Sequence, residues 1–195
     1  MIRRAVFLDR DGTINEDPGY IGDINLVKLF PDTISALSLL KNNLNLLLIV
    51  ISNQSGIARR FITTEQVEAV NQKINELLSE GRAEIDKYYY CPHHPNYNSA
   101  DECSCRKPSP QLVFQASMDF NIDIKNSYFI GDSVSDFDCA LNAGCKFILV
   151  KTGNGLESIS ALQKQNKFPS FAAANLMDAA NFILTDMTEQ KKIDD

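Results

Sequence analysis

Side chains of the types that enzymes use in catalysis stand directly after short apolar runs in this chain of 195 residues. Asp9 and Asp11 follow the first run, where paired carboxylates can bind a hard cation, attack as nucleophiles or transfer protons. One Asp-x-Asp pair alone is weak evidence, because most such pairs cap solvated turns. The other polar residues that stand after such runs or at expected helix starts are Ser52, Asn53, Lys107, Asp132 and Asp136. Together the set predicts a reaction site.

The chemistry that fits this set is attack by a carboxylate on a phosphate ester. Two anions repel each other, and a divalent cation between them removes the repulsion while an ammonium group neutralises the transferred group. Mg²⁺ prefers one or two carboxylates with phosphate oxygens and water. Asp9, Asp132 and Asp11, the last through a nearby carbonyl, are therefore the expected Mg²⁺ ligands. The alternative makes Asp132 a helix N-cap and Lys107 a surface charge.

A second group of possible metal ligands lies in the middle of the chain. Three thiolates and one imidazole, from Cys91, His93, Cys103 and Cys105, can fill a tetrahedral Zn²⁺ shell without an open position, which predicts a structural site. The polar loop at 91–105 has no apolar periodicity, so we expect the metal to supply its folding energy. Two alternatives are small buried thiols without metal, and His94 as the ligand in place of His93. The remaining cysteines, Cys139 and Cys145, are expected in the core.

The elements that must position these groups follow from the pattern of apolar residues. Short runs that are apolar on both faces indicate buried strands of a parallel sheet, and amphipathic segments between them indicate helices. The expected strands are residues 5–8, 46–51, 88–90, 128–130 and 146–150. The expected helix signals are Pro31-Asp32, a capping box of Thr63 with Gln66, Ser109-Pro110, and a helix over 136–143 that ends at Gly144. This alternation predicts an α/β fold with a doubly wound, mostly parallel sheet.

The chain reads as one domain over residues 1–187, with the loop at 91–105 inserted and a polar, fraying tail at 188–195. Apolar residues make up 44% of the chain, which is enough for one sizeable core. The interval between the first two strands, and the interval from Asn53 to Lys107, leave no room for a separate cap domain. We therefore expect only loops 15–23 and 91–105 to close the site.

Charge and hydropathy exclude several classes of partner. The net charge of −6 speaks against nucleic acid and against an anionic membrane surface. The apolar run at 5–8 is too short for a signal peptide, and the longest run, at 46–51, is too short to cross a bilayer. The odd, clustered cysteines argue against a secreted disulfide framework. We expect a cytoplasmic monomer that acts on a small molecule.

The residues resemble, in order, the four motifs of haloacid dehalogenase superfamily phosphatases. The matching segments are Asp9-x-Asp11-Gly-Thr13, Ser52-Asn53, Lys107 and Gly-Asp132-x-x-x-Asp136. The resemblance covers most of the chain, to about residue 150, and implies a Rossmann-like fold. It implies that Asp9 is the nucleophile, that Asp11 is the general acid and base, and that Ser52 and Lys107 hold the phosphoryl oxygens. It further implies that Asp132 completes the Mg²⁺ shell and that Asp136 orients its neighbours.

Within that superfamily the chain is similar to the family of D-glycero-D-manno-heptose 1,7-bisphosphate 7-phosphatases. The similarity rests on residues 15–20, on residues 52–58 and on the cysteine loop that ends in Arg106-Lys107-Pro108. It implies a phosphorylated sugar as substrate. It also implies that Arg106 contacts the far end of the substrate. The residues expected to contact the sugar are Asp17, Pro18, Gly19 and Tyr20, and those expected to bind the transferred phosphate are Ser52, Asn53, Gln54 and Ser55. Ser133 stands where close relatives are expected to carry a basic residue.

Three other functions remain open at this point. Histidinol-phosphate phosphatases share the same loop plan. A polynucleotide 3′-phosphatase would use the same motifs, but the acidic balance and the lack of a basic, aromatic-rich stretch speak against it. A non-catalytic, zinc-stabilised binding module would be expected to have lost Asp9, Asp11 or Lys107, and the chain retains all three.

Overall fold

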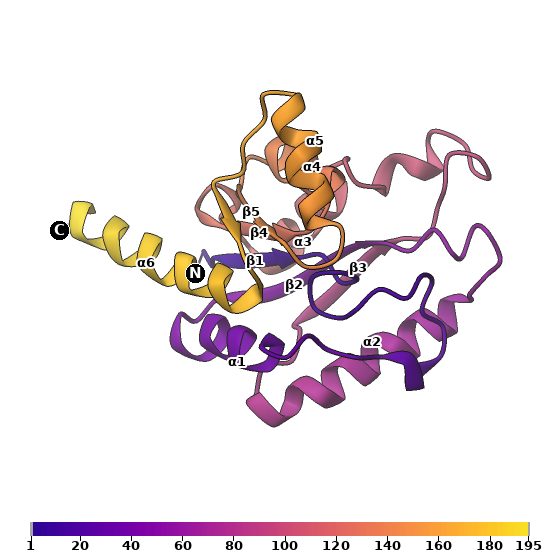
Figure 1. Cartoon of the computed structure of the whole chain (residues 1–195), viewed down its shortest axis with the longest axis horizontal. Coiled ribbons are helices and arrows are strands. Elements are labelled where there is room, and N and C mark those ends of the chain that lie inside the picture. The colour runs from indigo at the N-terminus through magenta and orange to yellow at the C-terminus, as the bar shows by residue number, and fades with distance from the viewer. Residues whose placement is uncertain (1, 195) are drawn as a thin grey trace.

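The computed structural model describes residues 2–194, without the side chains of residues 191, 193 and 194. Six strands form one parallel sheet in the order β3-β2-β1-β4-β5-β6 (Figure 1). The strands are β1 Ala5–Leu8, β2 Leu47–Asn53, β3 Lys87–Cys91, β4 Tyr128–Gly131, β5 Lys146–Val150 and β6 Phe171–Ala173. The order reverses between β1 and β4, and in such doubly wound sheets ligands bind outside the carboxyl ends of the strands at that switch point.

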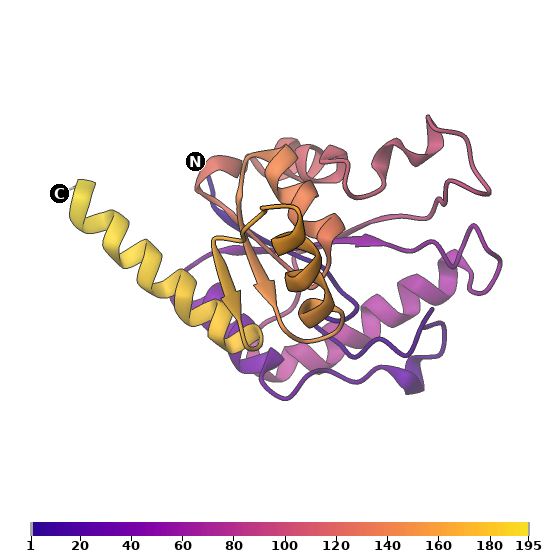
Figure 2. The ribbon, with the colours of Figure 1, turned by 45° about the horizontal axis from the view of Figure 1, so that its top comes forward.

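Helices cover both faces of the sheet (Figure 1, Figure 2). They are α1 Thr33–Ser38, α2 Thr64–Leu78, α3 Gln111–Phe120, α4 Val134–Ala143, α5 Gly155–Lys164 and α6 Leu176–Asp194. One apolar cluster packs α1, α2 and α6 against one face, and a second packs α3, α4 and α5 against the other. Because β1, β2, β4 and β5 have buried side chains on both faces, these four strands read as continuous apolar runs in the sequence. The predicted doubly wound parallel sheet is confirmed.

The local signals for helix ends act at the residues where the sequence placed them, with small shifts. Thr63 and Gln66 form a reciprocal capping box at α2, and Gly144 ends α4 with a left-handed φ of 83°. Ser109 is not the N-cap of α3, because Pro110 occupies that position and the Ser109 hydroxyl accepts the Gln111 N–H instead. α4 begins at Val134, before the expected start at residue 136.

Three parts of the chain differ from the expectation. β6 and α5 carry no sequence prediction. α6 continues to Asp194 through the segment predicted as a fraying tail from 188 onward, since that segment holds helix-forming residues and neither Gly nor Pro. The loop at 91–105 is not wholly irregular either: Cys91 is the last residue of β3, and Glu102–Cys105 forms a 3₁₀ turn. Among residues 2–194 no helix is long and apolar enough to cross a membrane.

Candidate active site

A cavity of about 390 Å³ opens where the carboxyl ends of β1, β2 and β4 meet. Asp9 directly follows β1, and its backbone N–H donates to Ile130 of β4 at 2.9 Å. The cavity is lined by Asp9, Asp11, Asp17, Gly19, Tyr20, Ser52, Asn53, Gln54, Lys107, Asp132, Ser133, Ser135 and Asn154. Polar side chains from segments far apart in the sequence therefore converge at the switch point of the sheet.

Lys107 is the cation at the base of this cavity, and its side chain is almost fully buried. Its Nζ donates to Asp9 Oδ1 at 2.8 Å and to the Ile51 carbonyl at 2.8 Å, and it lies 2.6 Å from Asp136 Oδ1. The ammonium group therefore makes two hydrogen bonds and one further close ion pair. Burial alone would lower the pKa of Lys107, but the charges of Asp136 and Asp9 outweigh it and raise the pKa above its usual value. The ammonium therefore stays charged.

Asn53 fixes the main chain that carries Lys107. The Asn53 Oδ1 accepts the Lys107 N–H at 3.0 Å, and the Asn53 Nδ2 donates to the Lys107 carbonyl at 3.2 Å. This two-bond contact pairs both main-chain polar groups of Lys107, which lies outside the helices and strands. The sequence predicted Asn53 as a phosphate-binding residue, and the structure places it in the cavity lining and as a brace for Lys107.

Asp132 follows β4 and is held by the turn after β5. The Asn154 backbone N–H donates to Asp132 Oδ2 at 2.7 Å, and the Asn154 Nδ2 donates to the same oxygen at 3.2 Å. Gly12 and Gly153 flank this carboxylate with φ values of 84° and 53°, and a Cβ on either would collide with Asp132 Oδ2. The carboxylate thus needs two glycines beside it as well as its own place at the strand end.

Three carboxylates converge closely enough to hold one cation. One oxygen each of Asp9, Asp132 and Asp136 lie within 4.8 Å of one another. Burial raises the pKa of Asp132 to about 6, despite the bonds from Asn154. Burial, followed by the charge of Asp136, raises the pKa of Asp9 well above its usual value. Carboxylates that are this crowded and desolvated suit a hard divalent cation with oxygen ligands.

Asp11 lines the same cavity, but its carboxylate lies outside that group of three. It accepts from Arg10 at 3.0 and 2.7 Å, from Asn15 at 2.9 Å and from Gln54 at 2.9 Å. Burial raises its pKa, but the Arg10 charge and these hydrogen bonds outweigh burial and lower the pKa below its usual value. Arg10 is itself buried and donates to Asn71 at 3.0 Å. The Asp11 carboxylate is thus held as an anion.

The phosphate-binding residues predicted on β2 are connected to Asp11. Gln54 Nε2 donates both to Asp11 Oδ2 at 2.9 Å and to Ser52 Oγ at 2.8 Å. Ser52 and Gln54 line the cavity, whereas the nearly buried Ser55 is absent from the described lining. Asp11, the predicted general acid and base, and Ser52, the predicted phosphate-binding hydroxyl, therefore accept hydrogen bonds from the same Gln54 amide group.

The predicted sugar-contacting segment, residues 17–20, forms one wall of the cavity. Asp17, Gly19 and Tyr20 line the cavity, and Pro18 is absent from the described lining. The Asp17 carboxylate accepts the Gly19 N–H at 2.8 Å, and Gly19 has a φ of 88° that favours glycine. This tight turn directs the Tyr20 ring toward the cavity.

The loop at 91–105 brings two of its four predicted zinc ligands into contact. The Cys91 thiol, which is buried at the end of β3, contacts the Cys105 thiol and the His93 backbone, and burial raises its pKa to about 12. Among the side chains that the structure describes, the group of Asp9, Asp132 and Asp136 is the only one in which three such ligand atoms lie within 4.8 Å of one another. The structure therefore brings two of the predicted magnesium ligands, Asp9 and Asp132, together with Asp136, which was predicted as an orienting residue.

Arg106, the residue predicted to meet the far end of the substrate, follows this loop. Its Nη1 donates to the His93 carbonyl at 3.1 Å, and Arg106 is absent from the described cavity lining. The adjacent Lys107 reaches the base of the cavity, so the two neighbouring cations occupy different places.

Sequence reasoning missed several residues of the site. Arg10, Ser135 and Asn154 were not predicted, although each lines the cavity or holds a residue that does. A sequence signal existed for Asn154, because it lies in the turn after the expected strand at 146–150 and thus at the same sheet edge. Ser133, which stands where a basic residue is expected, caps α4 together with Asp136.

Comparison with known proteins gives a consistent result. Residues 104–179 match the model of the HAD-hydrolase-like family. The chain is 40% identical to a D-glycero-D-manno-heptose-1,7-bisphosphate 7-phosphatase from Chlorobaculum tepidum, over 90% of this chain and 92% of that protein. It is 41% identical to a D-glycero-beta-D-manno-heptose-1,7-bisphosphate 7-phosphatase from Escherichia coli (strain K12), over 76% of this chain and 80% of that protein.

One solved structure resembles the chain over nearly its whole length. It is the D,D-heptose 1,7-bisphosphate phosphatase from B. bronchiseptica in complex with magnesium and phosphate. The TM-score is 0.83 at 28% sequence identity, covering 94% of this chain and 99% of that one. The resemblance to haloacid dehalogenase phosphatases predicted from the sequence is confirmed by these matches.

Proposed function

The chain belongs to the haloacid dehalogenase family of hydrolases, and on that premise we propose that it removes the 7-phosphate of D-glycero-D-manno-heptose 1,7-bisphosphate. The observation that carries the proposal is the convergence of Asp9, Asp132 and Lys107 in one cavity of a chain 40% identical to such phosphatases. The cell would use the product to make nucleotide-activated heptose for lipopolysaccharide core precursors.

In the proposed reaction a carboxylate oxygen of Asp9 attacks the phosphorus and forms an aspartyl-phosphate, and the bond from phosphorus to the sugar oxygen breaks. The contacts of Asp11 favour its anion in the free protein, so this step requires that Asp11 takes up a proton when the substrate binds. Asp11 then gives that proton to the sugar oxygen, and the sugar leaves as an alcohol. In the second step Asp11 accepts a proton from water, whose oxygen attacks the phosphorus and releases phosphate and free Asp9. Ser52 and Lys107 hold the phosphoryl oxygens throughout, and both line the cavity.

Mg²⁺ is the proposed cofactor, and the residues present fit it. Asp9 and Asp132 would hold it with their carboxylates, and Asp11 through a main-chain carbonyl. The pairing of Asp136 with Lys107 leaves Asp136 as an orienting residue rather than a ligand. When bound, the ion reduces the repulsion between the attacking carboxylate and the phosphate ester. The raised pKa values of Asp9 and Asp132 support the fit, since a cation there would favour their ionised forms.

The loops, rather than a cap domain, are proposed to enclose the sugar. Tyr20 and Asp17 lie in the cavity wall and are placed to contact it, and Arg106 is proposed to meet the far end from the opposite loop. Zn²⁺ in the loop at 91–105 is proposed as a structural ion held by Cys91, His93, Cys103 and Cys105. The contact between Cys91 and Cys105 supports this assignment. The cytoplasmic location and the monomeric state stay predictions.

The substrate assignment is tested by kcat/KM on three compounds with Mg²⁺ present. We expect heptose 1,7-bisphosphate to be preferred over histidinol phosphate and over a 3′-phosphorylated oligonucleotide. Both anomers of the heptose compound are included, because the sequence does not determine the preferred one. A value for histidinol phosphate that is about tenfold higher or more would reverse the assignment.

Zinc is tested separately by elemental analysis of protein purified without added metal or chelator. We expect about one zinc per chain, and less in a Cys103→Ser variant. A near-zero zinc content in the unmodified protein rejects the zinc site and leaves the phosphatase assignment unaffected.

A further inference from the structure

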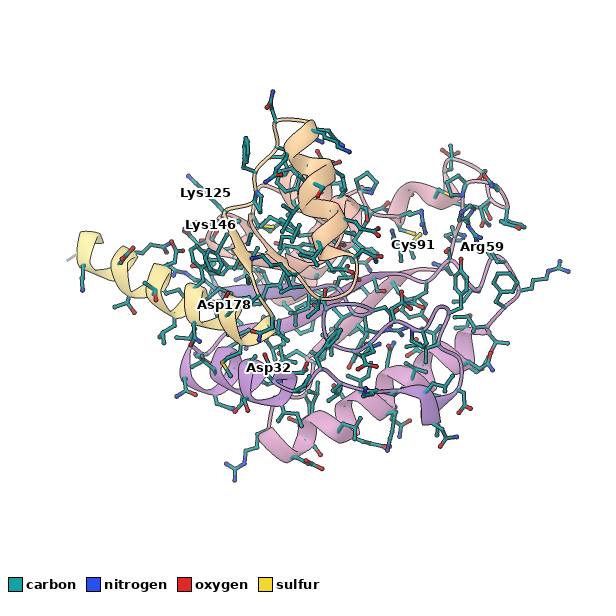
Figure 3. All side chains as sticks on the ribbon, viewed as in Figure 1. Asp32, Arg59, Cys91, Lys125, Lys146 and Asp178 are labelled. Carbon is teal, nitrogen blue, oxygen red and sulfur yellow. The ribbon has the colours of Figure 1, made fainter. Side chains whose placement is uncertain are left out.

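Arg59 contacts residues of two different loops, and one of these residues, Tyr20, lines the cavity. Its guanidinium carbon is 5.8 Å from the centroid of the Tyr20 ring, and its Nη2 is 2.7 Å from His94 Nε2. Tyr20 belongs to the loop at 15–23, and His94 belongs to the loop at 91–105. In Figure 3 Arg59 and Cys91 are labelled at the same end of the molecule, far from Lys125 and Lys146. One side chain thus connects the two loops that are expected to enclose the substrate.

The Tyr20 ring that Arg59 contacts is held from several sides. Its centroid is 5.2 Å from that of Phe61, and a Cβ on Gly56 would lie 2.7 Å from the ring. Tyr20 has a φ of 46°, which a tyrosine rarely adopts, so neighbouring groups must keep the residue in that conformation. Because Tyr20 lines the cavity, the residues around Arg59 set the position of a cavity wall.

The turn that carries Arg59 is also bonded to the start of the other loop. The Gln54 N–H donates to the Cys91 carbonyl at 2.8 Å, and the Ala58 N–H donates to the Pro92 carbonyl at 3.2 Å. Beyond that point the His94 ring packs edge-on against Tyr97 at 5.7 Å. His94 therefore offers Arg59 an anchor in the part of the loop that the main-chain bonds do not reach.

In this position the Arg59 side chain leaves one of its own N–H donors without a hydrogen bond. Its Nε is buried and has no hydrogen-bond partner among the described residues. A buried donor without a partner is unfavourable, and such groups in folded proteins call for an explanation other than stability. The next residue, Arg60, carries the same charge on an exposed side chain for which no contact within residues 2–194 is described.

We propose that Arg59 is a positioning residue for substrate binding, which holds Tyr20 to His94 and so fixes the width of the cavity mouth around the distal part of the substrate. This proposal rests on the proposed function, in which the substrate carries a sugar and a second phosphate beyond the transferred one. The reacting groups at Asp9 and Lys107 lie at the base of the cavity and make no described contact with Arg59. Loss of Arg59 therefore acts on KM for a large substrate.

The test compares two substrates in wild type and in Arg59→Gln. The first is heptose 1,7-bisphosphate, and the second is p-nitrophenyl phosphate, which has no sugar and no second phosphate. We expect KM for the bisphosphate to rise about tenfold, or about 1.4 kcal/mol, with kcat changed less than about twofold. For p-nitrophenyl phosphate we expect both constants to change less than about twofold. Arg60→Gln is the matched control and leaves all four values unchanged.

Two further variants separate the two contacts of Arg59. Arg59→Lys keeps a cation near the Tyr20 ring but loses the planar group, so we expect a KM increase of about threefold. His94→Gln keeps an acceptor for Arg59 and is expected to retain more affinity than His94→Leu. A merely structural role would lower the thermal midpoint and affect both substrates alike, without this order.

The outcomes distinguish the two proposals. An Arg59→Gln variant whose KM matches that of Arg60→Gln overturns the positioning role and leaves the substrate assignment intact. Equal losses on both substrates overturn it as well. A wild type that does not hydrolyse heptose 1,7-bisphosphate refutes the substrate assignment alone. The Arg59 comparison is then made with the preferred compound of the substrate panel, and the same KM pattern is required. If Arg59→Gln does not fold, Arg59→Lys and the two His94 variants decide.

Discussion

The edge of the sheet at β1, β2 and β4 and the loop at 91–105 both gather polar residues, but by different means. At the sheet edge, Lys107 meets Asp9 from a position 98 residues away in sequence, and Arg10 meets Asn71 from 61 residues away. In the loop, Ser99 donates to Glu102 only three residues away, through its N–H at 2.8 Å and its hydroxyl at 2.9 Å.

The difference is one of burial and of what holds the charges. The side chains of Lys107 and Asp136 are almost fully buried, so their attraction is strong and the loss of either partner leaves an uncompensated charge. Glu102 is exposed, and water screens its interactions. The sheet edge is therefore held by contacts across the whole fold, while the part of the loop at 98–102 is ordered by short-range bonds.

The largest expected effect comes from the carboxylate that the mechanism uses as nucleophile. Asp9→Asn removes the attacking oxygen anion, so kcat is expected to fall on the order of 10⁴-fold or more while the fold stays intact. Steady-state kinetics and circular dichroism measure the two effects. The control is Asp138→Asn, since Asp138 pairs with Lys167 at 2.6 Å and lies outside the described cavity lining. A near-normal rate in Asp9→Asn would falsify the assignment of the nucleophile.

The next largest effect concerns stability, and Lys107 is the residue that tests it. Lys107→Met leaves Asp9 and Asp136 buried without their cation, so the free energy of unfolding is expected to fall by about 3–5 kcal/mol. Urea unfolding in the presence of a chelator measures it, since a bound metal would mask part of the loss.

A double variant tests whether the loss of stability comes from the carboxylates that Lys107 neutralises. Adding Asp136→Asn to Lys107→Met removes one of the two stranded charges, and the double variant is expected to recover part of the loss. If the free energy of unfolding of Lys107→Met lies within about 1 kcal/mol of the wild-type value, the ion pairs at the sheet edge contribute no more to stability than exposed ion pairs do.

The residues at the sheet edge could be predicted from the sequence because each apolar run shows where a strand of the parallel sheet ends. Each run ends at the same edge, so Asp9, Ser52 and Asp132 could be grouped before any contact was known. β6 was missed because it has only three residues, two of them alanine, which gives no periodic signal. The direction in which a side chain points depends instead on contacts with residues far away in the sequence. Nothing in Asp-x-Asp indicated that Arg10 would turn back on Asp11 and reach Asn71.

The loop was harder to predict for the opposite reason. Its polar composition suggested that only a metal would order it, yet Asn98, Ser99 and Glu102 form hydrogen bonds among themselves and begin a 3₁₀ turn. Such side-chain to backbone bonds depend on the exact turn and leave no apolar periodicity in the sequence. The structure thus shows local order in the loop that does not depend on the zinc prediction.

The smallest expected effect tests that local order directly. Glu102→Ala removes the acceptor of the Ser99 N–H, so the Ser99 amide is expected to exchange its hydrogen about tenfold faster or more. Because the bond is exposed and local, the urea midpoint and kcat are expected to stay within error of wild type. Glu80→Ala is the control, since Glu80 is also exposed and lies in the 3₁₀ turn Ser79–Gly81, outside the loop at 91–105. A global loss of stability in Glu102→Ala comparable to that in Lys107→Met would mean that the loop, too, is coupled to the whole fold.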